Sequence, residues 1–200
     1  MTEHYYAKNP GAAHDVRQVI FEVLGLKIQC TTDSGVFSRE GLDMGTRILL
    51  EALPEVSGRV LDLGCGWGPV GVALGKKYPG AELVLTDVNE RAAELAKRNL
   101  RDNGVRNAQV VCGEGFENVE GMFDLIALNP PIRAGKAVIY ELFASAAARL
   151  NAGGALYIVI RKQQGAESAQ KYLKTIYSDV KRIARDKGYW VLRCAEPIIN

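Results

Sequence analysis

The sequence has few of the residues that hold metal ions or build disulfide frameworks. It contains two histidines and four cysteines in 200 residues. No two cysteines are close enough in sequence to form a CxxC pair, and no histidine cluster accompanies them. We therefore expect no metal and four reduced, mostly buried thiols, at Cys30, Cys65, Cys112 and Cys194.

Long apolar runs and an excess of one charge are also missing. The longest apolar run, "ALYIVI", is far too short to cross a bilayer. The first ten residues, "MTEHYYAKNP", have neither the basic nor the apolar region of a signal peptide. We expect a cytoplasmic protein without a membrane segment. The net charge of +2 excludes a globally basic coat for nucleic acid, so any RNA must bind at a local basic patch.

What is present is the composition of an ordinary globular domain. Apolar residues make up 48% of the chain and charged residues 24%. We find no internal repeat, low-complexity segment or linker, so we expect one domain over residues 1–200. Within it, residues 1–57 would form an N-terminal arm, a hairpin and a helix, and residues 58–200 the core.

The start of the chain predicts a β-hairpin followed by a helix. The runs "RQVIFEVLG" and "LKIQCTT" are rich in β-formers and meet at Leu24-Gly25. The next segment, "SREGLDMGTRILLEALP", predicts a helix with Asp43 as its N-cap and Pro54 past its end.

From residue 58 on, strand-like and helix-like segments alternate, which predicts a parallel sheet with helices on both faces. We expect strands at 59–64, 81–87, 108–113, 123–129, 153–162, 180–186 and 189–195, and helices at 68–80, 89–104, 137–150 and 166–177. The last two strands meet at Lys187-Gly188, a turn too short for a crossover, so they must be antiparallel. The fold class is therefore α/β, with a seven-stranded, mostly parallel sheet, one antiparallel strand and an N-terminal β-hairpin.

One glycine-rich turn predicts a ligand site. In "VLDLGCGWGPVG" the glycines Gly64, Gly66 and Gly68 follow a strand with GxGxG spacing, which lets a ligand approach the backbone closely. The spacing differs from the dinucleotide fingerprint GxGxxG. Asp87 ends the next strand, where an acid accepts hydrogen bonds from ribose hydroxyls. Its other interpretation is a helix cap, which Asn89 fits better, so a nucleoside-containing ligand is favoured.

Two further acids have two interpretations each. Asp62 precedes the glycine turn and would bind an ammonium group or cap the N–H groups of the turn itself. Glu114, in "VVCGEGF", would face an adenine amino group or be a solvated turn residue.

The stretch "NPPIRAGK" follows the strand "FDLIALN" and predicts a rigid polar turn. Prolines fix φ and lack an N–H, so Pro130 and Pro131 end the strand. The turn therefore fixes two hydrogen-bond acceptors, Asn129 Oδ1 and the Pro130 carbonyl, where the strand ends. The alternative is that Asn129 only caps the helix after Gly135, which would not require two prolines.

These motifs, in this order and spacing, closely resemble class I S-adenosylmethionine-dependent methyltransferases, which have a Rossmann-like fold. The resemblance covers about residues 58–195 and rests on "VLDLGCGWGPVGVAL", "LVLTDVNERAAELAKRNL" and "FDLIALNPPI". It implies S-adenosylmethionine as cofactor, with the glycine turn at its methionine end and Asp62 near its amine. It also implies that Asp87 holds the ribose and that the remaining contacts come from Cys65, Val88, Glu114, Gly115, Phe116 and Asn129. With a methyl donor in the pocket, Asn129 Oδ1 and the Pro130 carbonyl would accept the two N–H groups of a planar amine and aim its lone pair at the methyl group.

A narrower resemblance rests on "GVFSREGLDMGTRILL" and "NPPIRAGK". Together they resemble the RsmC-like small-domain ribosomal RNA guanine-N2 methyltransferases, in a short form without the additional N-terminal domain. The resemblance implies that Phe37, Ser38 and Thr46 border the cofactor and the target base, although Phe37 as a core aromatic and Thr46 as a first-turn helix residue are alternatives. Ile132 stands where the family has an aromatic residue, and Phe37 is a candidate to stack on the base instead.

A basic stretch near the end of the chain fits RNA. Residues 161–187 carry eight basic and three acidic side chains. Arg161 and Lys162 follow a strand, at the edge where such sheets form their sites, and Arg133 and Lys136 follow the proline turn. We expect a monomer that acts on ribosomal RNA or a pre-ribosomal particle. The alternatives are a protein glutamine-N5 methyltransferase and a non-catalytic, S-adenosylmethionine-binding RNA-assembly factor.

Overall fold

The computed structural model describes residue 8 and residues 11–198, so most of the expected N-terminal arm lies outside the described residues. The first elements are a β-hairpin and a helix, as predicted: β1 (Arg17–Val23), β2 (Leu26–Thr32) and α1 (Met44–Ala52). The two strands pair in antiparallel register from Arg17 opposite Thr32 to Val23 opposite Leu26. Asp43 is the N-cap of α1, and its side chain accepts a hydrogen bond from the Thr46 N–H, which confirms that prediction.

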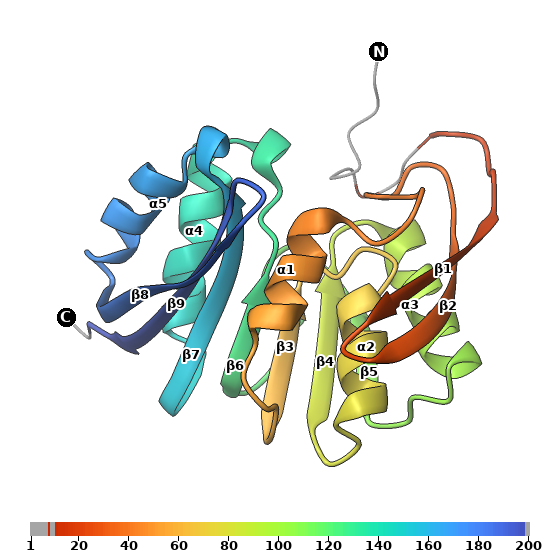
Figure 1. Cartoon of the computed structure of the whole chain (residues 1–200), viewed down its shortest axis with the longest axis horizontal. Coiled ribbons are helices and arrows are strands. Elements are labelled where there is room, and N and C mark those ends of the chain that lie inside the picture. Colours follow the sequence, from red (N-terminus) through yellow and green to blue (C-terminus); the bar gives the residue numbers. More distant parts are fainter. Residues whose placement is uncertain (1–7, 9–10, 199–200) are drawn as a thin grey trace.

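A mixed sheet and four further helices follow. They are β3 (Arg59–Leu63), α2 (Pro69–Lys77), β4 (Glu82–Asp87), α3 (Glu90–Asp102), β5 (Ala108–Cys112), β6 (Phe123–Leu128), the 3₁₀ turn η1 (Ile132–Ala134), α4 (Lys136–Ala147), β7 (Leu150–Arg161), the 3₁₀ turn η2 (Lys162–Gln164), α5 (Ala166–Leu173), β8 (Tyr177–Asp186) and β9 (Tyr189–Pro197). The strand order is β5-β4-β3-β6-β7-β9-β8, and only β9 runs against the others, which confirms the predicted sheet (Figure 1).

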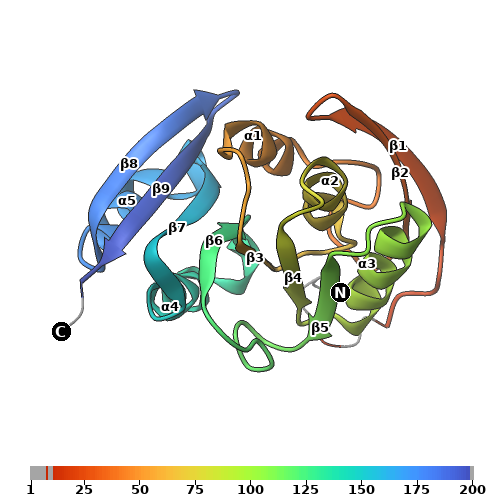
Figure 2. The ribbon, with the colours of Figure 1, turned by 90° about the horizontal axis from the view of Figure 1, so that it is seen from below.

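The sheet separates two apolar layers because successive strand residues point to opposite faces. On one face, Val60 and Leu85 pack with α1, α2, α3 and the inner side of the hairpin. On the other, Leu61 and Ile126 pack with α4 and α5. The hairpin lies on the outer side of α2 and α3, as Figure 2 shows from below. Both faces of the sheet are thus covered, and its strand ends are left to form a site.

The predicted final helix is shorter than expected. We predicted helix from 166 to 177, but α5 ends at Leu173 and β8 already begins at Tyr177. Tyr177 is buried in the second apolar layer, and its hydroxyl donates a 2.9 Å hydrogen bond to the Phe143 carbonyl of α4. This tertiary contact outweighs the helical pattern of the local sequence.

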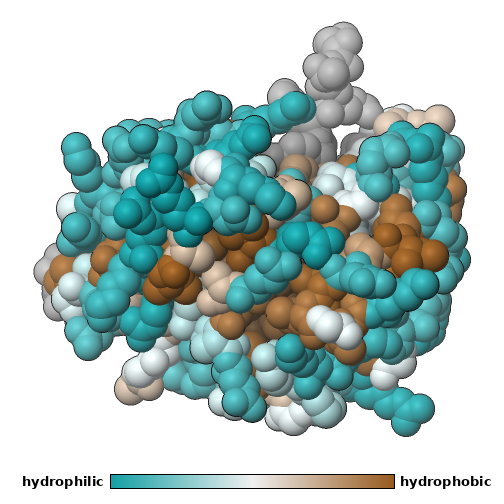
Figure 3. All heavy atoms as spheres, viewed as in Figure 1, coloured by the Kyte–Doolittle hydropathy of each residue, from teal (hydrophilic) through white to brown (hydrophobic). Residues whose placement is uncertain are grey.

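The face of the molecule drawn in Figure 3 is mostly polar. Figure 3 shows hydrophilic residues over most of one face, with hydrophobic residues in a band across its middle, over α1. None of the helices in the described part of the chain has the length and apolarity to cross a membrane. The four cysteines are free thiols, of which only Cys112 is not fully buried, as expected.

Candidate active site

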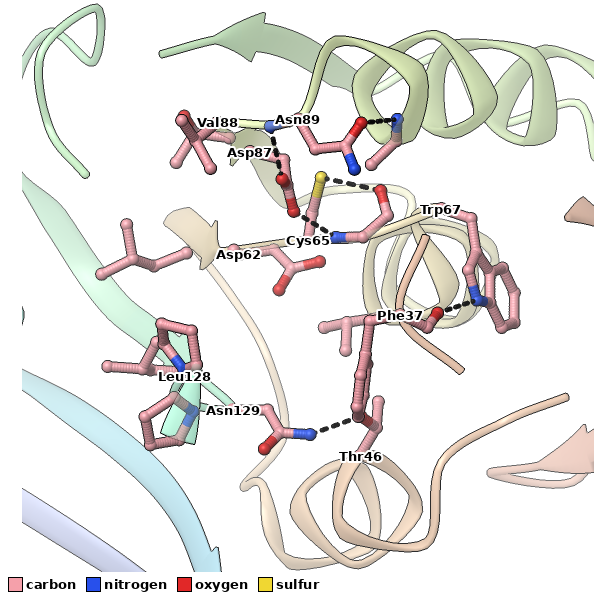
Figure 4. A pocket seen from close by; sticks show the side chains of 18 of the residues that line it. Phe37, Thr46, Asp62, Cys65, Trp67, Asp87, Val88, Asn89, Leu128 and Asn129 are labelled. Carbon is pink, nitrogen blue, oxygen red and sulfur yellow. Dashed lines mark hydrogen bonds between the residues drawn. The ribbon is translucent and has the colours of Figure 1, made fainter. Parts of the chain in front are cut away.

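A pocket opens at the carboxyl ends of β3, β4 and β6, next to the N-terminus of α1 (Figure 4). The positions that line it include most of those expected to contact cofactor or substrate: Phe37, Ser38, Thr46, Asp62, Gly64, Cys65, Gly66, Asp87, Val88, Gly115, Asn129, Pro130 and Pro131. Segments that lie far apart in the sequence therefore meet at one edge of the sheet, the edge where ligands bind in open α/β sheets.

The glycine turn between β3 and α2 gives the pocket a backbone wall. Gly64 and Gly66 have φ of +76° and +55°, and a Cβ at either position would meet no atom within 4 Å. Their faces are thus open to a ligand. The N–H groups of Gly64 and Cys65 both donate to the Thr86 carbonyl, at 2.8 and 2.9 Å, which fixes the turn against β4.

The third glycine of the motif has another role. A Cβ at Gly68 would lie 3.0 Å from the Cα of Ala96, and one at Gly71 would lie 2.4 Å from Leu85 Cδ2. Gly68 does not line the pocket; it lets α2 approach α3. The GxGxG spacing therefore combines two ligand-facing glycines with one that serves helix packing.

Asp87 is held by the backbone on both of its oxygens. Its Oδ2 accepts from the Gly66 N–H at 2.8 Å and its Oδ1 from the Asn89 N–H at 2.9 Å. Burial raises the pKa of this carboxyl, and the two N–H groups oppose that shift. Asn89, not Asp87, caps α3 by accepting from the Ala92 N–H. The carboxylate is thus fixed at the pocket wall.

Asp62 is buried and incompletely paired. It is 5% exposed, and within the described residues its Oδ2 has no hydrogen-bond partner. Burial, with the nearby Asp87 charge, raises the pKa of Asp62 to about 8, while the Gly71 N–H at the start of α2 lowers it. Figure 4 shows the carboxyl group directed into the pocket. One oxygen therefore accepts from the first turn of α2, not from the glycine turn as one interpretation had it, and the other has no partner within the described residues.

Asn129 begins the turn after β6. Its Nδ2 donates to Asp43 Oδ2 at 3.1 Å and to Thr46 Oγ1 at 3.0 Å, both at the N-terminus of α1. The N-cap of α4 is Gly135, with no side-chain hydrogen bond, so Asn129 does not cap that helix. The interpretation of Asn129 as a simple helix cap is thereby wrong.

The segment between β2 and α1 forms the outer wall of the pocket. Phe37 lines the pocket yet is 38% exposed. The buried Trp67 of the glycine turn donates from Nε1 to the carbonyls of Phe37 and Ser38, at 3.1 and 3.3 Å. Asn89 also donates to the Gly35 carbonyl at 2.8 Å. This wall is therefore tied to the same turns that would hold a cofactor.

Several expected residues do not line the pocket. Glu114 is exposed, and its N–H donates to the Glu117 carboxylate. Phe116 packs beside the second apolar layer, with Arg149 over its ring at 5.9 Å. Ile132 also packs at that layer. Of the segment after β5, only the backbone at Gly113 and Gly115 reaches the pocket.

The four expected RNA contacts are exposed around the same edge of the sheet. Lys136 lies over the Tyr140 ring at 5.0 Å and Arg161 over the Tyr189 ring at 5.2 Å. Lys162 forms a 3.7 Å ion pair with Glu167. Arg133 is exposed in η1. These four cations lie at or just after the carboxyl ends of β6 and β7, and none of them lines the pocket, whose charged side chains are the acids Asp43, Asp62 and Asp87.

Sequence reasoning missed other residues of the pocket, among them Trp67, Thr86, Asn89 and Asp43, of which two were assigned only as helix caps. Trp67 had a usable signal: a large aromatic inside a glycine turn needs a hydrogen-bond partner for its N–H when buried. No sequence pattern predicts that Asp43 contacts Asn129, because that contact depends on which segments the fold brings together. No three His, Cys, Asp or Glu side chains in the described residues gather to hold a metal.

The sheet order with its single reversed strand, the glycine turn and the acid that ends β4 define a class I methyltransferase fold. The chain belongs to the Methyltransferase small domain family, which it matches over residues 27–193. It is an S-adenosylmethionine-dependent methyltransferase of the RsmC-like group.

The relatives differ in how much of their length corresponds to this chain. An uncharacterized protein, YbxB of Bacillus subtilis, is 39% identical over 96% of this chain and 98% of its own length. Ribosomal RNA small subunit methyltransferase C of Escherichia coli is 40% identical over 70% of this chain, but only 41% of its own length is covered. A T. thermophilus 16S rRNA N2 methyltransferase (RsmC), solved with AdoMet and guanosine, superposes with a TM-score of 0.82 at 28% identity. It covers 90% of this chain, which spans half of that protein.

The pocket fits S-adenosylmethionine on two structural grounds. The buried Oδ2 of Asp62, which has no partner among the residues that the structure describes, suits the ammonium group of the cofactor, because a buried carboxylate oxygen needs a partner. The open faces of Gly64 and Gly66 leave room for its methionine end to pass along the backbone.

Proposed function

We propose that the protein methylates the exocyclic N2 of a guanine in small-subunit ribosomal RNA. The observation that carries this proposal is the Asn129 amide at the edge of the pocket. Its Nδ2 is engaged by Asp43 and Thr46, which leaves Oδ1 to accept a hydrogen bond from a substrate amine. The names of the RsmC relatives support RNA as the class of substrate.

In this proposal the inner pocket holds the cofactor. Asp62 binds the ammonium group, Asp87 the ribose hydroxyls, and Val88 with the backbone at Gly115 borders the adenine. Bound S-adenosylmethionine would supply an electrophilic methyl group and become S-adenosylhomocysteine, and the methylated amine would lose one proton to solvent. The fixed carboxylate of Asp87 needs no reorganisation before it accepts hydrogen bonds from the ribose hydroxyls.

The residues of the proline turn activate the amine by geometry. The lone pair of an exocyclic purine amine is delocalised into the ring. Asn129 Oδ1 and the Pro130 carbonyl accept its two N–H groups in a tetrahedral arrangement, so the lone pair leaves the ring plane and faces the pocket. The prolines keep the turn rigid. Catalysis is thus by positioning and electrostatics, with no covalent enzyme intermediate.

Phe37 supplies the stacking surface for the base. It is the aromatic residue that lines the pocket and is also exposed, whereas Ile132 packs toward the second apolar layer. Every base presents a flat face on which an aromatic ring can stack. Phe37, on the opposite wall of the pocket, can therefore take the place of an aromatic residue at position 132. Ser38 borders the same wall.

The exposed cations bind the RNA backbone. Arg133, Lys136, Arg161 and Lys162 lie around the edge of the sheet where the pocket opens, which suits contacts to phosphates on either side of an extruded base. In this proposal residues 1–200 act as a single domain and a monomer, on ribosomal RNA or on a pre-ribosomal particle.

The test is the identity of the product. The protein would be incubated with methyl-labelled S-adenosylmethionine and either ribosomal RNA or ribosomal particles from cells that lack it, followed by nucleoside mass spectrometry. We expect N2-methylguanine in small-subunit RNA. Label on a protein glutamine would assign the second candidate, a glutamine-N5 methyltransferase, and label on adenine N6 would also overturn the proposal. Absence of label from every fraction would indicate an RNA-binding factor without turnover.

A further inference from the structure

The side-chain amide of Asn129 contacts Asp43, a residue from outside the proline turn. Asn129 and Asp43 are 86 positions apart in sequence, yet their side chains meet at 3.1 Å. Thr46, in the first turn of α1, takes the other contact at 3.0 Å, and Figure 4 shows the Asn129 amide directed toward it. The N-terminus of α1 is therefore the outer partner of the proline turn.

The chemistry of these partners determines which way the amide faces. A carboxylate accepts hydrogen bonds and cannot donate them, so the Asn129 atom opposite Asp43 must be Nδ2. The Thr46 hydroxyl accepts the second N–H of the same nitrogen. A rotated amide would place its oxygen against the carboxylate and would be repelled. Both N–H groups are thus engaged within the protein, and Oδ1 is the only hydrogen-bonding atom of the Asn129 side chain left for a substrate.

Asp43 is itself held in place. As N-cap of α1 it accepts from the Thr46 N–H at 3.0 Å. A Cβ at Gly45 would come within 3.0 Å of both Asp43 Oδ2 and Tyr189 Cε1, so the start of α1 lies tightly between this carboxylate and β9. The orientation of Asn129 is therefore set by a rigid element of the fold.

We propose that Asp43 is a positioning residue for methyl transfer, which it supports by fixing the Asn129 amide with Oδ1 toward the substrate amine. The inference rests on the proposed function. A hydrogen bond from Nδ2 to a carboxylate also polarises the amide and strengthens Oδ1 as an acceptor. The hydrogen bond from the substrate amine to Oδ1 strengthens during the reaction, because the amine nitrogen gains positive charge as it takes the methyl group.

The test begins with Asp43→Ser. Serine is a good N-cap, so α1 should remain folded, but its shorter side chain does not reach Asn129. We expect kcat to fall about ten- to a hundredfold, with KM for S-adenosylmethionine nearly unchanged. Asp43→Asn keeps length and capping but offers a neutral acceptor, so it should recover part of kcat. Thr46→Val removes only the second acceptor and should cost less than Asp43→Ser.

A double-mutant cycle separates positioning from direct contact with the substrate. If Asp43 acts through Asn129, then Asp43→Ser in an Asn129→Ala background should lower kcat by no more than about twofold further. Losses that multiply would overturn the inference and assign Asp43 to the substrate itself. A wild-type kcat for a folded Asp43→Ser variant would also overturn it.

The proposed function fails by a different result. If Asn129→Ala alone keeps full activity, the mechanism proposed for the turn is wrong whatever Asp43 does. If Asn129→Ala is inactive and Asp43→Ser is active, the mechanism stands and only the positioning role is refuted.

Discussion

The two ends of the pocket are built in different ways. At the cofactor end, the contacts are backbone N–H groups that meet a carboxylate from the same βαβ unit; Gly66 and Asp87 are 21 positions apart. At the substrate end, side chains from distant segments meet: Asn129 with Asp43 and Thr46, and Trp67 with the carbonyl of Phe37. The first end is a local motif, whereas the second is assembled only by the whole fold.

This difference has an energetic side. A backbone N–H is present whatever the side chain, so at the cofactor end only the two acids and the glycines of the turn should be sensitive to substitution. The substrate end depends on a chain of polar side chains, in which removal of one member leaves another without a partner. We therefore expect single substitutions to affect binding at the first end and turnover at the second.

The largest effect should come from Asn129→Ala. Removing one preorganised polar contact to the reacting group should lower kcat by about 10²–10³, while the affinity for S-adenosylmethionine stays near that of the wild type. Calorimetric titration and single-turnover rates measure the two quantities separately. The matched control is Asn151→Ala, which also removes a hydrogen bond from Asn to Asp, at 2.8 Å to Asp124, but at the amino end of the strands. A fully active Asn129→Ala would contradict the division between the two ends.

Asp87→Ala should instead weaken cofactor binding by at least about tenfold, because hydrogen bonds to a charged group contribute about 1.5–3 kcal/mol. The control is Asp124→Ala, whose Oδ2 likewise accepts a backbone N–H, from Arg59 at 2.7 Å. Thermal unfolding without cofactor should be measured for both variants, since both free a backbone donor. Unchanged affinity in a folded Asp87→Ala protein would place the ribose elsewhere.

Asp62 should make cofactor binding depend on pH. Its pKa is raised from 3.8 to about 8 in the folded protein. Between these two pH values, the Asp62 carboxyl group of the cofactor-free protein holds a proton that the unfolded chain has already released. The free energy of unfolding therefore falls as pH rises from about 4 to 8. An ammonium ligand favours the carboxylate and expels the proton, so affinity should rise about tenfold from pH 6 to pH 7.

Calorimetry in two buffers of different ionisation enthalpy, at about pH 6.5, tests this linkage. Wild-type protein should release close to one proton per S-adenosylhomocysteine bound, and Asp62→Asn none. Equal heats in the two buffers for the wild type would mean that Asp62 does not face the ammonium group.

The same division explains what could be predicted from the sequence. The sheet, the caps at Asp43 and Asn89 and the position of Asp87 at the end of a strand follow from local patterns. The structure confirms the sheet and both caps, and β4 does end at Asp87. The contact between Asp43 and Asn129 could not be predicted, because it depends on α1 lying against the end of β6. The expectation that Phe116 contacts the cofactor has a related weakness. It was based on the position of Phe116 after β5, but the ring packs toward the second apolar layer. Burial of a side chain on one face or the other of a loop is decided by the tertiary packing.

The smallest effect should come from the rim of the substrate end. Arg133→Glu with Lys136→Glu should weaken RNA binding and lower the slope of log affinity against log salt by about one unit for each phosphate that is no longer bound. Both side chains are exposed, so cofactor affinity should not change. The matched control is Lys97→Glu with Arg101→Glu, an equal change of charge on the exposed side of α3. If both pairs lower the slope equally, the RNA responds to net charge alone. If neither does, the loop after the proline turn is not part of the RNA path, and the same charge reversal at Arg161 and Lys162 becomes the next test.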